Sequence, residues 1–321
     1  MVASPSPEPL DFNAVPASTP IVAITPIRYP QLAEAVLRAG GVLGSPADAD
    51  ALVWTDPMDP DHLASVLVGS PARWVQLPFA GVESFADHLE PGRTWTSAKG
   101  IYGPAVAEHA LALMLAAARG LPHHVRARSW SSPDVVPARR LKGTRVLIVG
   151  TGGIGRALAR LLEPLEPGIT AVNRSGTPMP GASSTVPAAL LGEVVGQAEW
   201  VVLAAPLTTE TARLFDRRML GAMNRQAWLV NVGRGGLVDT DALVEALEHG
   251  RLGGLALDVT DPEPLPDGHP LWSFSNVIIT PHIANTWDMA LPELAARVER
   301  NVLAFAGSTP LEGLVDIGLR Y

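Results

Sequence analysis

The feature that most constrains the fold is a glycine-rich turn between a predicted strand and a predicted helix. The β-branched run RVLIVG occupies residues 145–150, and the helical pattern RALARLLE occupies residues 156–163. The turn GTGGIG at 150–155 has the GxGxxG spacing, which in this strand-and-helix context predicts a dinucleotide-binding turn. The residues expected to bind the dinucleotide here are Gly150, Gly152, Gly153, Ile154 and Gly155.

The glycines of this turn each have a physical reason. We expect Gly150 to allow the tight turn, Gly152 to let the backbone approach a pyrophosphate, and Gly155 to let the helix pack close to the strand. The pyrophosphate would accept hydrogen bonds from the free N–H groups at the helix N-terminus. The alternative is a glycine-rich turn that binds no ligand.

Short β-branched runs alternate with helical segments along most of the chain. This alternation is typical of βαβ units with a parallel sheet and predicts an α/β fold. Residues 91–103 are less periodic and are predicted to connect two domains, and residues 121–145 are predicted to form a loop or crossover. The predicted strands are 21–25, 51–55, 74–77, 145–150, 227–232, 254–259 and 276–280, and the predicted helices include 31–38, 62–68 and 106–119.

The size of the chain allows two domains of ordinary size, because it has 321 residues of which 47% are hydrophobic. Residues 1–18 are rich in proline and small polar side chains, which predicts a flexible tail. They have neither the basic start nor the apolar run of a signal peptide.

Composition argues against several classes of protein. A formal net charge of −8 disfavours a nucleic-acid partner, since phosphate binding favours a basic face. Cysteine is absent, which excludes a disulfide framework and a thiolate metal site, and no metal site of another kind is expected. The absence of cysteine is consistent with a protein of the reducing cytoplasm. The most apolar stretch, residues 106–118, has about half the length needed to cross a bilayer, so no membrane partner is expected.

The predicted strand at 170–173 ends in Asn173, Arg174 and Ser175. In NAD-binding versions of the fold this strand end carries an acidic residue for the ribose hydroxyls. A guanidinium and a hydroxyl can instead hydrogen-bond a 2′-phosphate. We therefore expect all three residues to contact the cofactor and NADPH to be preferred, with NAD possible. The alternative is a polar strand end with one solvated arginine.

Three later strands each lead into a reactive side chain. Arg234 follows the strand at 227–232, Glu263 lies in the loop after 254–259, and His282 follows 276–280. Ligands of a doubly wound sheet bind outside the carboxyl ends of its strands, so the three side chains are candidates for one cleft. Taken singly, each has an ordinary alternative as a surface charge, a solvated loop residue or a structural histidine.

The helix at 106–119 is apolar almost all round. Its periodicity leaves two interpretations open: a helix buried in the core of its own chain, or one buried against another subunit.

Several motifs, in this order, resemble those of the D-isomer-specific 2-hydroxy acid dehydrogenase family. The resemblance extends over nearly the whole chain after residue 20. Within the family, the chain is similar to the glyoxylate/hydroxypyruvate reductase-like, NADP-type members. The motifs are QLPFAGVESF (76–85), AVAEHALALMLAAAR (105–119), VGTGGIGRALARLL (149–162), VVLAAPLTTETARLFD (201–216), LVNVGRGGLVD (229–239), ALDVTDPEPLP (256–266), TPHIANT (280–286) and LVDIGLRY (314–321).

The resemblance implies two doubly wound parallel-sheet domains, with a Rossmann dinucleotide domain inserted in a flavodoxin-like substrate domain. The substrate domain would comprise residues 19–100 and 288–321, and the dinucleotide domain residues 101–287. The closing residues 314–321 would form the last strand. A homodimer through the helix at 106–119 is also implied, which favours the interface interpretation of that helix.

The resemblance further implies that NAD(P)H reduces a small 2-oxo acid. His282 would be the general acid, and Glu263 would hydrogen-bond its imidazole and favour the protonated form. Arg234 would bind the substrate carboxylate and polarise the carbonyl. The implied substrate residues are Ala80, Gly81, Val82, Arg234 and His282, and the further cofactor residues are Pro206, Thr211, Val232, Gly233, Arg234, Asp258 and His282.

Two other functions fit the same motifs. One is a formate or phosphite dehydrogenase on the same scaffold, which the pairing of Glu263 with His282 disfavours. The other is a dinucleotide-sensing binding protein, which can keep all three reactive residues and is distinguished by a lack of turnover. Asn285 and Trp287 depart from the family pattern, so the pocket side of that loop is expected to be unusual.

Overall fold

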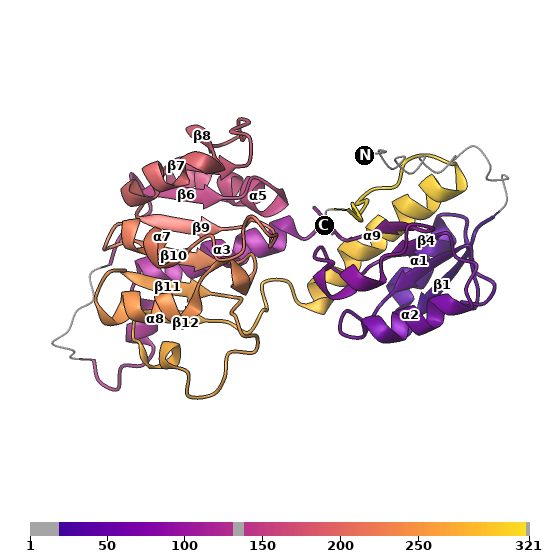
Figure 1. Cartoon of the computed structure of the whole chain (residues 1–321), viewed down its shortest axis with the longest axis horizontal. Helices are drawn as coiled ribbons and strands as arrows, with labels where there is room; N and C mark the ends of the chain where they lie inside the picture. The colour runs from indigo at the N-terminus through magenta and orange to yellow at the C-terminus, as the bar shows by residue number, and fades with distance from the viewer. Residues whose placement is uncertain (1–18, 131–137, 319–321) are drawn as a thin grey trace, which may run out of the picture. The chain divides into compact units, whose positions relative to one another are not determined.

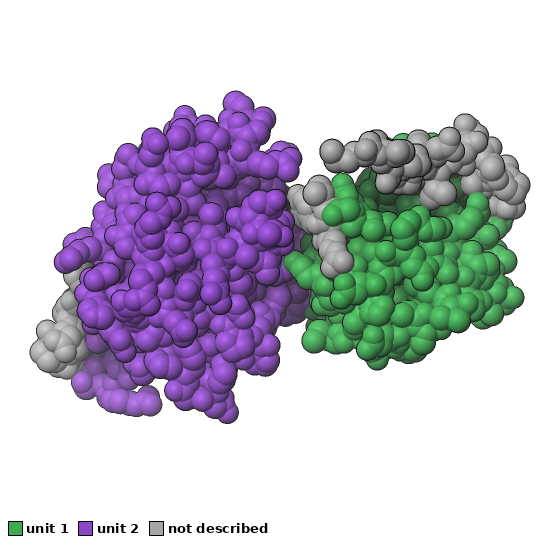
Figure 2. All heavy atoms as spheres, in the orientation of Figure 1, with its two compact units in different colours: residues 1–101, 287–321 green, residues 102–286 purple. Residues whose placement is uncertain are grey.

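The computed structural model describes residues 19–130 and 138–318. The chain divides into two compact units, coloured in Figure 2. Unit 1 consists of Met1–Ile101 and Trp287–Tyr321, and unit 2 of Tyr102–Thr286. The tail predicted at 1–18 and the last residues of the strand predicted at 314–321 lie outside the described residues.

Unit 1 is built on a five-stranded parallel sheet in the order β2-β1-β3-β4-β5, which is the flavodoxin-like order. Helices α1 and α9 pack against each other beside it. The strands are β1 (Ile21–Thr25), β2 (Val42–Leu43), β3 (Ala51–Trp54), β4 (Trp74–Gln76) and β5 (Thr94–Thr96), and the helices are α1 (Pro30–Arg38), α2 (Pro60–Val68), the 3-10 helix η2 (Glu83–His88) and α9 (Trp287–Ala306).

The sequence of unit 1 suits a sheet covered on both faces. All four residues of β3 are buried, as expected for a central parallel strand. Trp54 from this strand packs in one cluster with Leu63 of α2 and Trp95 of β5. Asp59 caps α2 by accepting a hydrogen bond from the backbone N–H of His62.

Unit 2 is built on a seven-stranded parallel sheet in the order β12-β11-β10-β9-β6-β7-β8 (Figure 1). From β6 the chain first adds β7 and β8 on one side, and then returns to add β9 to β12 on the other. The order therefore reverses between β6 and β9. The strands are β6 (Arg145–Val149), β7 (Gly168–Asn173), β8 (Ser184–Pro187), β9 (Trp200–Leu203), β10 (Trp228–Asn231), β11 (Gly254–Leu257) and β12 (Val277–Ile279).

Helices cover both faces of this second sheet. Val146 and Ile148 of β6 belong to the buried cluster formed with α3 and α5, whereas Leu147 and Val149 belong to the cluster formed with α7 and α8. This alternation along one strand confirms the predicted doubly wound α/β class. The helices are α3 (Gly103–Ala118), α4 (Leu121–His124), α5 (Gly153–Leu162), α6 (Leu191–Val194), α7 (Arg217–Ala222) and α8 (Thr240–Glu248), with 3-10 helices η3 (Glu163–Leu165), η4 (Ala188–Leu190), η5 (Val195–Gln197), η6 (Gly235–Leu237) and η7 (Pro270–Ser273).

Three sequence predictions about local structure need correction. Residues 91–103 do not only connect domains, because they contain β5, which pairs with β4. Residues 121–145 begin with the short helix α4 rather than with a loop. Among residues 314–318, Leu314 forms a single antiparallel bridge with Thr96, so the described part of the predicted last strand is one bridge pair.

Within the described ranges 19–130 and 138–318, no helix is both long enough and apolar enough to span a membrane. The cytoplasmic location and the lack of a nucleic-acid partner stay predictions.

Candidate active site

The glycine-rich turn lies where the strand order of unit 2 reverses. Gly150 has φ +110°, and a Cβ added to it would lie 2.5 Å from the carbonyl oxygen of Ala204, just after β9. A Cβ on Gly155 would lie 2.1 Å from the carbonyl oxygen of Gly150. Both contacts are far too short for a side chain, so glycine is required for β6, β9 and α5 to come this close.

The N-terminus of α5 fits a pyrophosphate. The first N–H groups of a helix have no acceptor within the helix, and its N-terminus carries a partial positive charge. The first turn of α5 contains no acidic residue that would repel an anion. A Cβ on Gly152, the N-cap, would meet no atom within 4 Å, so backbone is accessible there. Gly152, Gly153 and Ile154 are the residues that would hold the cofactor's phosphates.

At the end of β7, the amide of Asn173 holds the local turn together. Its Nδ2 donates to Thr151 Oγ1 at 3.1 Å and to the Thr177 carbonyl at 2.8 Å. Its Oδ1 accepts from the backbone N–H groups of Ser175 at 3.2 Å and Gly176 at 2.6 Å. Both amide protons of Asn173 are therefore engaged within the protein.

Arg174 is exposed and has an acidic neighbour that the sequence did not reveal. Glu210 lies in the loop after β9, and its carboxylate accepts a hydrogen bond from Thr208 Oγ1 at 2.7 Å. That bond, together with its own backbone and the nearby charge of Arg174, lowers the pKa of Glu210. Arg174 and Glu210 thus face the same edge of unit 2 with opposite charges.

The loop after β9 is held by Thr211. Its hydroxyl donates to the Pro206 carbonyl at 2.7 Å and accepts from the Thr208 N–H at 2.7 Å. This arrangement fixes Pro206 beside the end of the strand, on the edge where the glycine-rich turn also lies.

Arg234 lies on a turn that is held by hydrogen bonds and by close packing. Its backbone carbonyl accepts a hydrogen bond from Asn231 Nδ2 at 2.9 Å, and its Nη1 donates to the Gly233 carbonyl at 2.8 Å. A Cβ on Gly235 would lie 1.9 Å from the carbonyl oxygen of Thr260. The turn that carries Arg234 is therefore packed directly against the start of the loop that carries Glu263.

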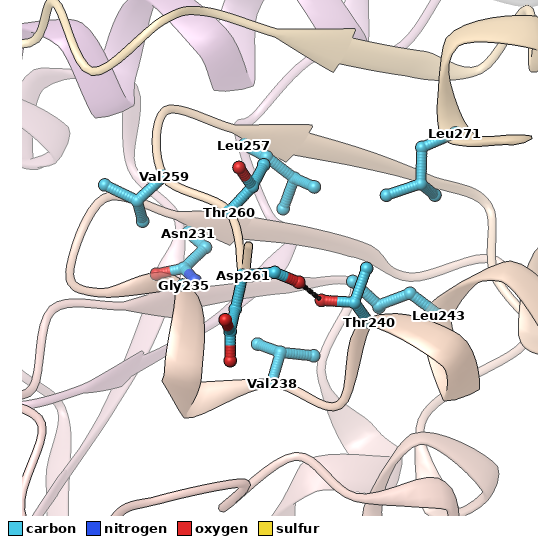
Figure 3. A pocket seen from close by; sticks show the side chains of 10 residues that line it. All are labelled: Asn231, Gly235, Val238, Thr240, Leu243, Leu257, Val259, Thr260, Asp261 and Leu271. Atoms are coloured by element: carbon cyan, nitrogen blue, oxygen red, sulfur yellow. Dashed lines mark hydrogen bonds between the residues drawn. The ribbon is translucent and has the colours of Figure 1, made fainter. Parts of the chain in front are cut away.

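Figure 3 shows a cavity between these two segments. Its volume is about 10 Å³, which is the space of about one water molecule. Thr240 of α8 donates to the Asp261 carbonyl at 2.5 Å across one side of it. The cavity is too small for a substrate, so the Arg234 turn and the following loop form a nearly solid support.

Glu263 and His282 lie within hydrogen-bond distance of each other. His282 Nδ1 lies 2.6 Å from Glu263 Oε1, and the two side chains are 52% and 42% exposed. Because this bond occupies Nδ1, a proton passed to a substrate would leave from Nε2. His282 has φ +52°, in the left-handed region that non-glycine residues rarely adopt.

Asp258 lies buried at the end of β11, with 2% of its surface exposed. Burial raises the pKa of its carboxyl. Hydrogen bonds from His109, Thr280 and the N–H groups of Ile283 and Ala284 outweigh burial, so the pKa lies below its ordinary value. Asp258 is therefore a charged group held inside unit 2 beside the His282 loop.

His109 belongs to this network, and the sequence analysis did not single it out. The sequence feature that could have identified it is a single imidazole within the apolar helix at 106–119. A single histidine in such a helix is more often structural than functional. Its Nε2 lies 3.0 Å from Thr280 Oγ1 and 3.3 Å from Asp258 Oδ1.

The remaining predicted substrate residues, Ala80 to Val82, lie in unit 1 after β4. Ala80 is exposed, and Val82 is buried at the start of η2. Next to them, the Phe79 ring meets the Trp287 ring edge-on at 6.1 Å. Trp287 also lies 5.3 Å from the ring of Tyr29, so three aromatic rings flank this loop within unit 1.

Comparison with known proteins gives consistent similarities. A family profile described as "D-isomer specific 2-hydroxyacid dehydrogenase, NAD binding domain" matches residues 111–284. A Corynebacterium melassecola protein, named "Uncharacterized protein in proB 3'region", is 36% identical over 307 residues, 92% of this chain and 99% of the relative. The glyoxylate reductase of Thermofilum pendens is 34% identical over 220 residues, 65% of this chain and 64% of that enzyme.

A solved structure is similar over both units. It is a D-isomer specific 2-hydroxyacid dehydrogenase from Xanthobacter autotrophicus Py2 in complex with NADPH and MES. The TM-score is 0.82 at 26% identity, and the similarity covers 95% of this chain and 100% of that one.

Proposed function

The chain belongs to the D-isomer-specific 2-hydroxyacid dehydrogenase family, and on that premise we propose that it transfers a hydride between a nicotinamide dinucleotide and a small 2-oxo acid. The observation that carries the proposal is the 2.6 Å bond between His282 Nδ1 and Glu263 Oε1. It pairs an acid–base group with an orienting carboxylate at the edge of the sheet that bears the glycine-rich turn. The similarity to a glyoxylate reductase supports a small 2-oxo acid as substrate.

The roles of the protein's own side chains follow from their chemistry. A bound nicotinamide would supply the hydride to C2 of the oxo acid. His282 donates a proton from Nε2 to the carbonyl oxygen, where negative charge develops. Glu263 fixes the orientation of the imidazole through Nδ1. Arg234 binds the substrate carboxylate with its forked donors. Contacts of the Ala80 to Val82 backbone with the substrate stay a prediction from the sequence.

The reaction is tested by assaying glyoxylate, hydroxypyruvate and pyruvate with each reduced cofactor. With the best substrate, His282→Ala should lower kcat by about a hundredfold or more, the usual scale of a general acid. Binding of the cofactor, followed by its fluorescence, should change far less than kcat, because the other cofactor residues are intact. Near wild-type turnover by His282→Ala would refute the catalytic assignment. Tight cofactor binding without turnover of any oxo acid would instead indicate a dinucleotide-sensing protein.

For the cofactor, we propose a preference for NADPH. The support is the lack of a carboxylate at positions 173–175 and the exposed guanidinium of Arg174 beside the hydroxyl of Ser175. Asn173 contributes indirectly, by shaping the turn that presents these two residues. The similar Xanthobacter autotrophicus enzyme was solved with NADPH.

For the quaternary structure, we propose a homodimer formed through α3. One face of this helix is exposed along its whole length and carries Pro104, Glu108, Ala112, Leu115 and Arg119. A two-fold axis perpendicular to the helix would make the two copies antiparallel and could place Glu108 of each opposite Arg119 of the other. Ala112 and Leu115 would meet between these ion pairs.

An apolar groove lies near the C-terminal end of the same helix. Its volume is about 310 Å³, and it lies between the end of α3, α4, η7 and β12. Trp272 and Val125 in its lining are 47% and 73% exposed. A contiguous exposed apolar surface of this kind is typical of an interface between protein chains, and we propose a second copy as its occupant.

A further inference from the structure

The backbone of His282 needs support from outside its own loop. A positive φ costs free energy in a residue with a side chain, so it persists only where surrounding contacts impose it. The orientation of the imidazole depends on this backbone, because the side chain leaves from the same Cα.

Asp258 supplies that support on both sides of His282. Its backbone carbonyl accepts the N–H of His282 at 2.8 Å. Its carboxylate accepts the N–H of Ile283 through Oδ1 and the N–H of Ala284 through Oδ2, both at 3.0 Å. Three successive backbone N–H groups are thus bound by one residue.

His109 also contacts this carboxylate, at Oδ1. Thr280 Oγ1 donates its proton to Asp258 Oδ1 at 2.6 Å, so toward His109 the hydroxyl can only accept. His109 Nε2, at 3.0 Å from that hydroxyl and 3.3 Å from the carboxylate, must therefore be the donor. The Nε2–H tautomer of His109 completes the hydrogen-bonding of the buried charge.

We propose that His109 is a positioning residue, which fixes the His282 loop through Thr280 and Asp258. The inference rests on the proposed function for its catalytic consequence, but not for its structural one. His109 brings α3 into the site: the helix holds the carboxylate, and the carboxylate holds the backbone of the general acid. A role in packing alone would require only a side chain of similar volume.

The structural consequence is tested by hydrogen–deuterium exchange of the peptide that contains Ile283 and Ala284. His109→Leu keeps the volume and removes the donor, and should speed exchange of this peptide by about tenfold or more. His109→Gln, which restores an N–H donor, should return exchange toward the wild-type rate. His124→Leu, at an exposed histidine of α4, is the matched control and should leave exchange unchanged.

The catalytic consequence is tested in the same variants with the best 2-oxo acid. His109→Leu should lower kcat by about tenfold to a hundredfold, the scale of a displaced catalytic group, and His109→Gln should recover most of the loss. Thr280→Val removes the bridging hydroxyl and serves as a second variant should His109→Leu fold poorly. The His109→Leu/Thr280→Val double variant should be little worse than either single one.

Two results would overturn the proposal. One is wild-type exchange around Ile283 in both His109→Leu and Thr280→Val. The other is equal impairment by His109→Leu and His109→Gln, which would indicate packing rather than hydrogen-bonding. Because exchange needs no substrate, a protein inactive on every oxo acid would refute the proposed function while the positioning role is still decided.

Discussion

At the scale of single residues, the buried carboxylate of Asp258 matters for stability as well as for the site. Its charge is balanced by hydrogen bonds that form only in the folded chain. A buried charge without such partners destabilises the folded state by more than the net contribution of the hydrogen bonds to stability.

Asp258→Asn should destabilise the protein by about 1–3 kcal/mol at neutral pH, the cost of losing charge-assisted bonds in a buried place. The folded-state pKa of Asp258 is lowered, so its contribution to stability is present above the unfolded pKa of about 3.9 and is lost as pH falls toward the folded value. Thermal unfolding of the two proteins from pH 7 to pH 3 checks this. The difference in Tm between the wild-type protein and Asp258→Asn should become smaller as the pH falls. A difference that grows would contradict a lowered pKa of Asp258 in the folded protein.

Cofactor choice is also decided by single side chains. Arg174→Ala should lower kcat/KM for NADPH by about tenfold or more, since an arginine–phosphate contact is worth roughly 1.5–3 kcal/mol, and should leave NADH nearly unchanged. Glu210→Gln should strengthen the preference for NADPH, because it removes a negative charge near the phosphate. Arg160→Ala, at an exposed position of α5, is the control.

Steady-state kinetics with both reduced cofactors provide the measurement. Equal kcat/KM values for NADPH and NADH in the wild-type protein would rule out the phosphate interpretation. An equal loss for both cofactors in Arg174→Ala would show that the guanidinium contacts the part that they share.

At the scale of elements, local patterns predict what local physics controls. The strands of unit 2 that precede Arg234, Glu263 and His282 are short, mostly apolar runs, and the glycine-rich turn is recognisable from its spacing between a strand and a helix. By contrast, β5 has the short sequence TWT, and it becomes a strand because β4 lies beside it. Strand pairing of this kind leaves little trace in three residues.

The network around His109 escaped prediction for a related reason. His109 and Thr280 are 171 positions apart, and only the packing of α3 on the sheet brings them together. Glu210 likewise bears on the cofactor site only because Arg174, just after β7, lies close enough for their charges to interact. Arg234, Glu263 and His282 could be predicted from motifs, and their catalytic roles stay predictions. The residues that support them depend on tertiary contacts, which motifs do not contain.

Gly155→Ala should destabilise unit 2 by about 1–3 kcal/mol, because the new methyl group would force apart backbone segments that now touch. Gly221→Ala is the matched control in helix α7, where a Cβ meets no atom within 4 Å; it should be neutral or stabilising by up to about 1 kcal/mol. Chemical denaturation compares the two variants. A Gly155→Ala protein as stable as the wild type would show that α5 and β6 can separate at little cost.

At the scale of the whole molecule, the proposed dimer makes a charge-reversal prediction. Glu108→Arg and Arg119→Glu should each raise the dimer Kd by at least about tenfold, since each places like charges opposite one another twice in a two-fold interface. The double variant should recover dimerisation, because the pairs re-form with reversed polarity. Sedimentation velocity gives the dimer Kd of the wild-type protein, the two single variants and the double variant. Failure of the double variant to recover would exclude an antiparallel pairing of α3.

The Asn173 turn has a consequence for redesign of this protein. A single exchange of Asn173 for aspartate, the obvious route to an NADH-using variant, would keep the bonds accepted from Ser175 and Gly176, and the Thr151 hydroxyl could donate to the new carboxylate. The bond to Thr177 would be lost, and a carboxylate would lie against the Thr177 carbonyl. The substitution that favours the new cofactor would thus loosen the turn that presents it. The Thr177 acceptor is a backbone carbonyl, which no substitution at position 177 removes, so retargeting requires a change in the course of the turn at 173–177 as well as a new side chain at Asn173.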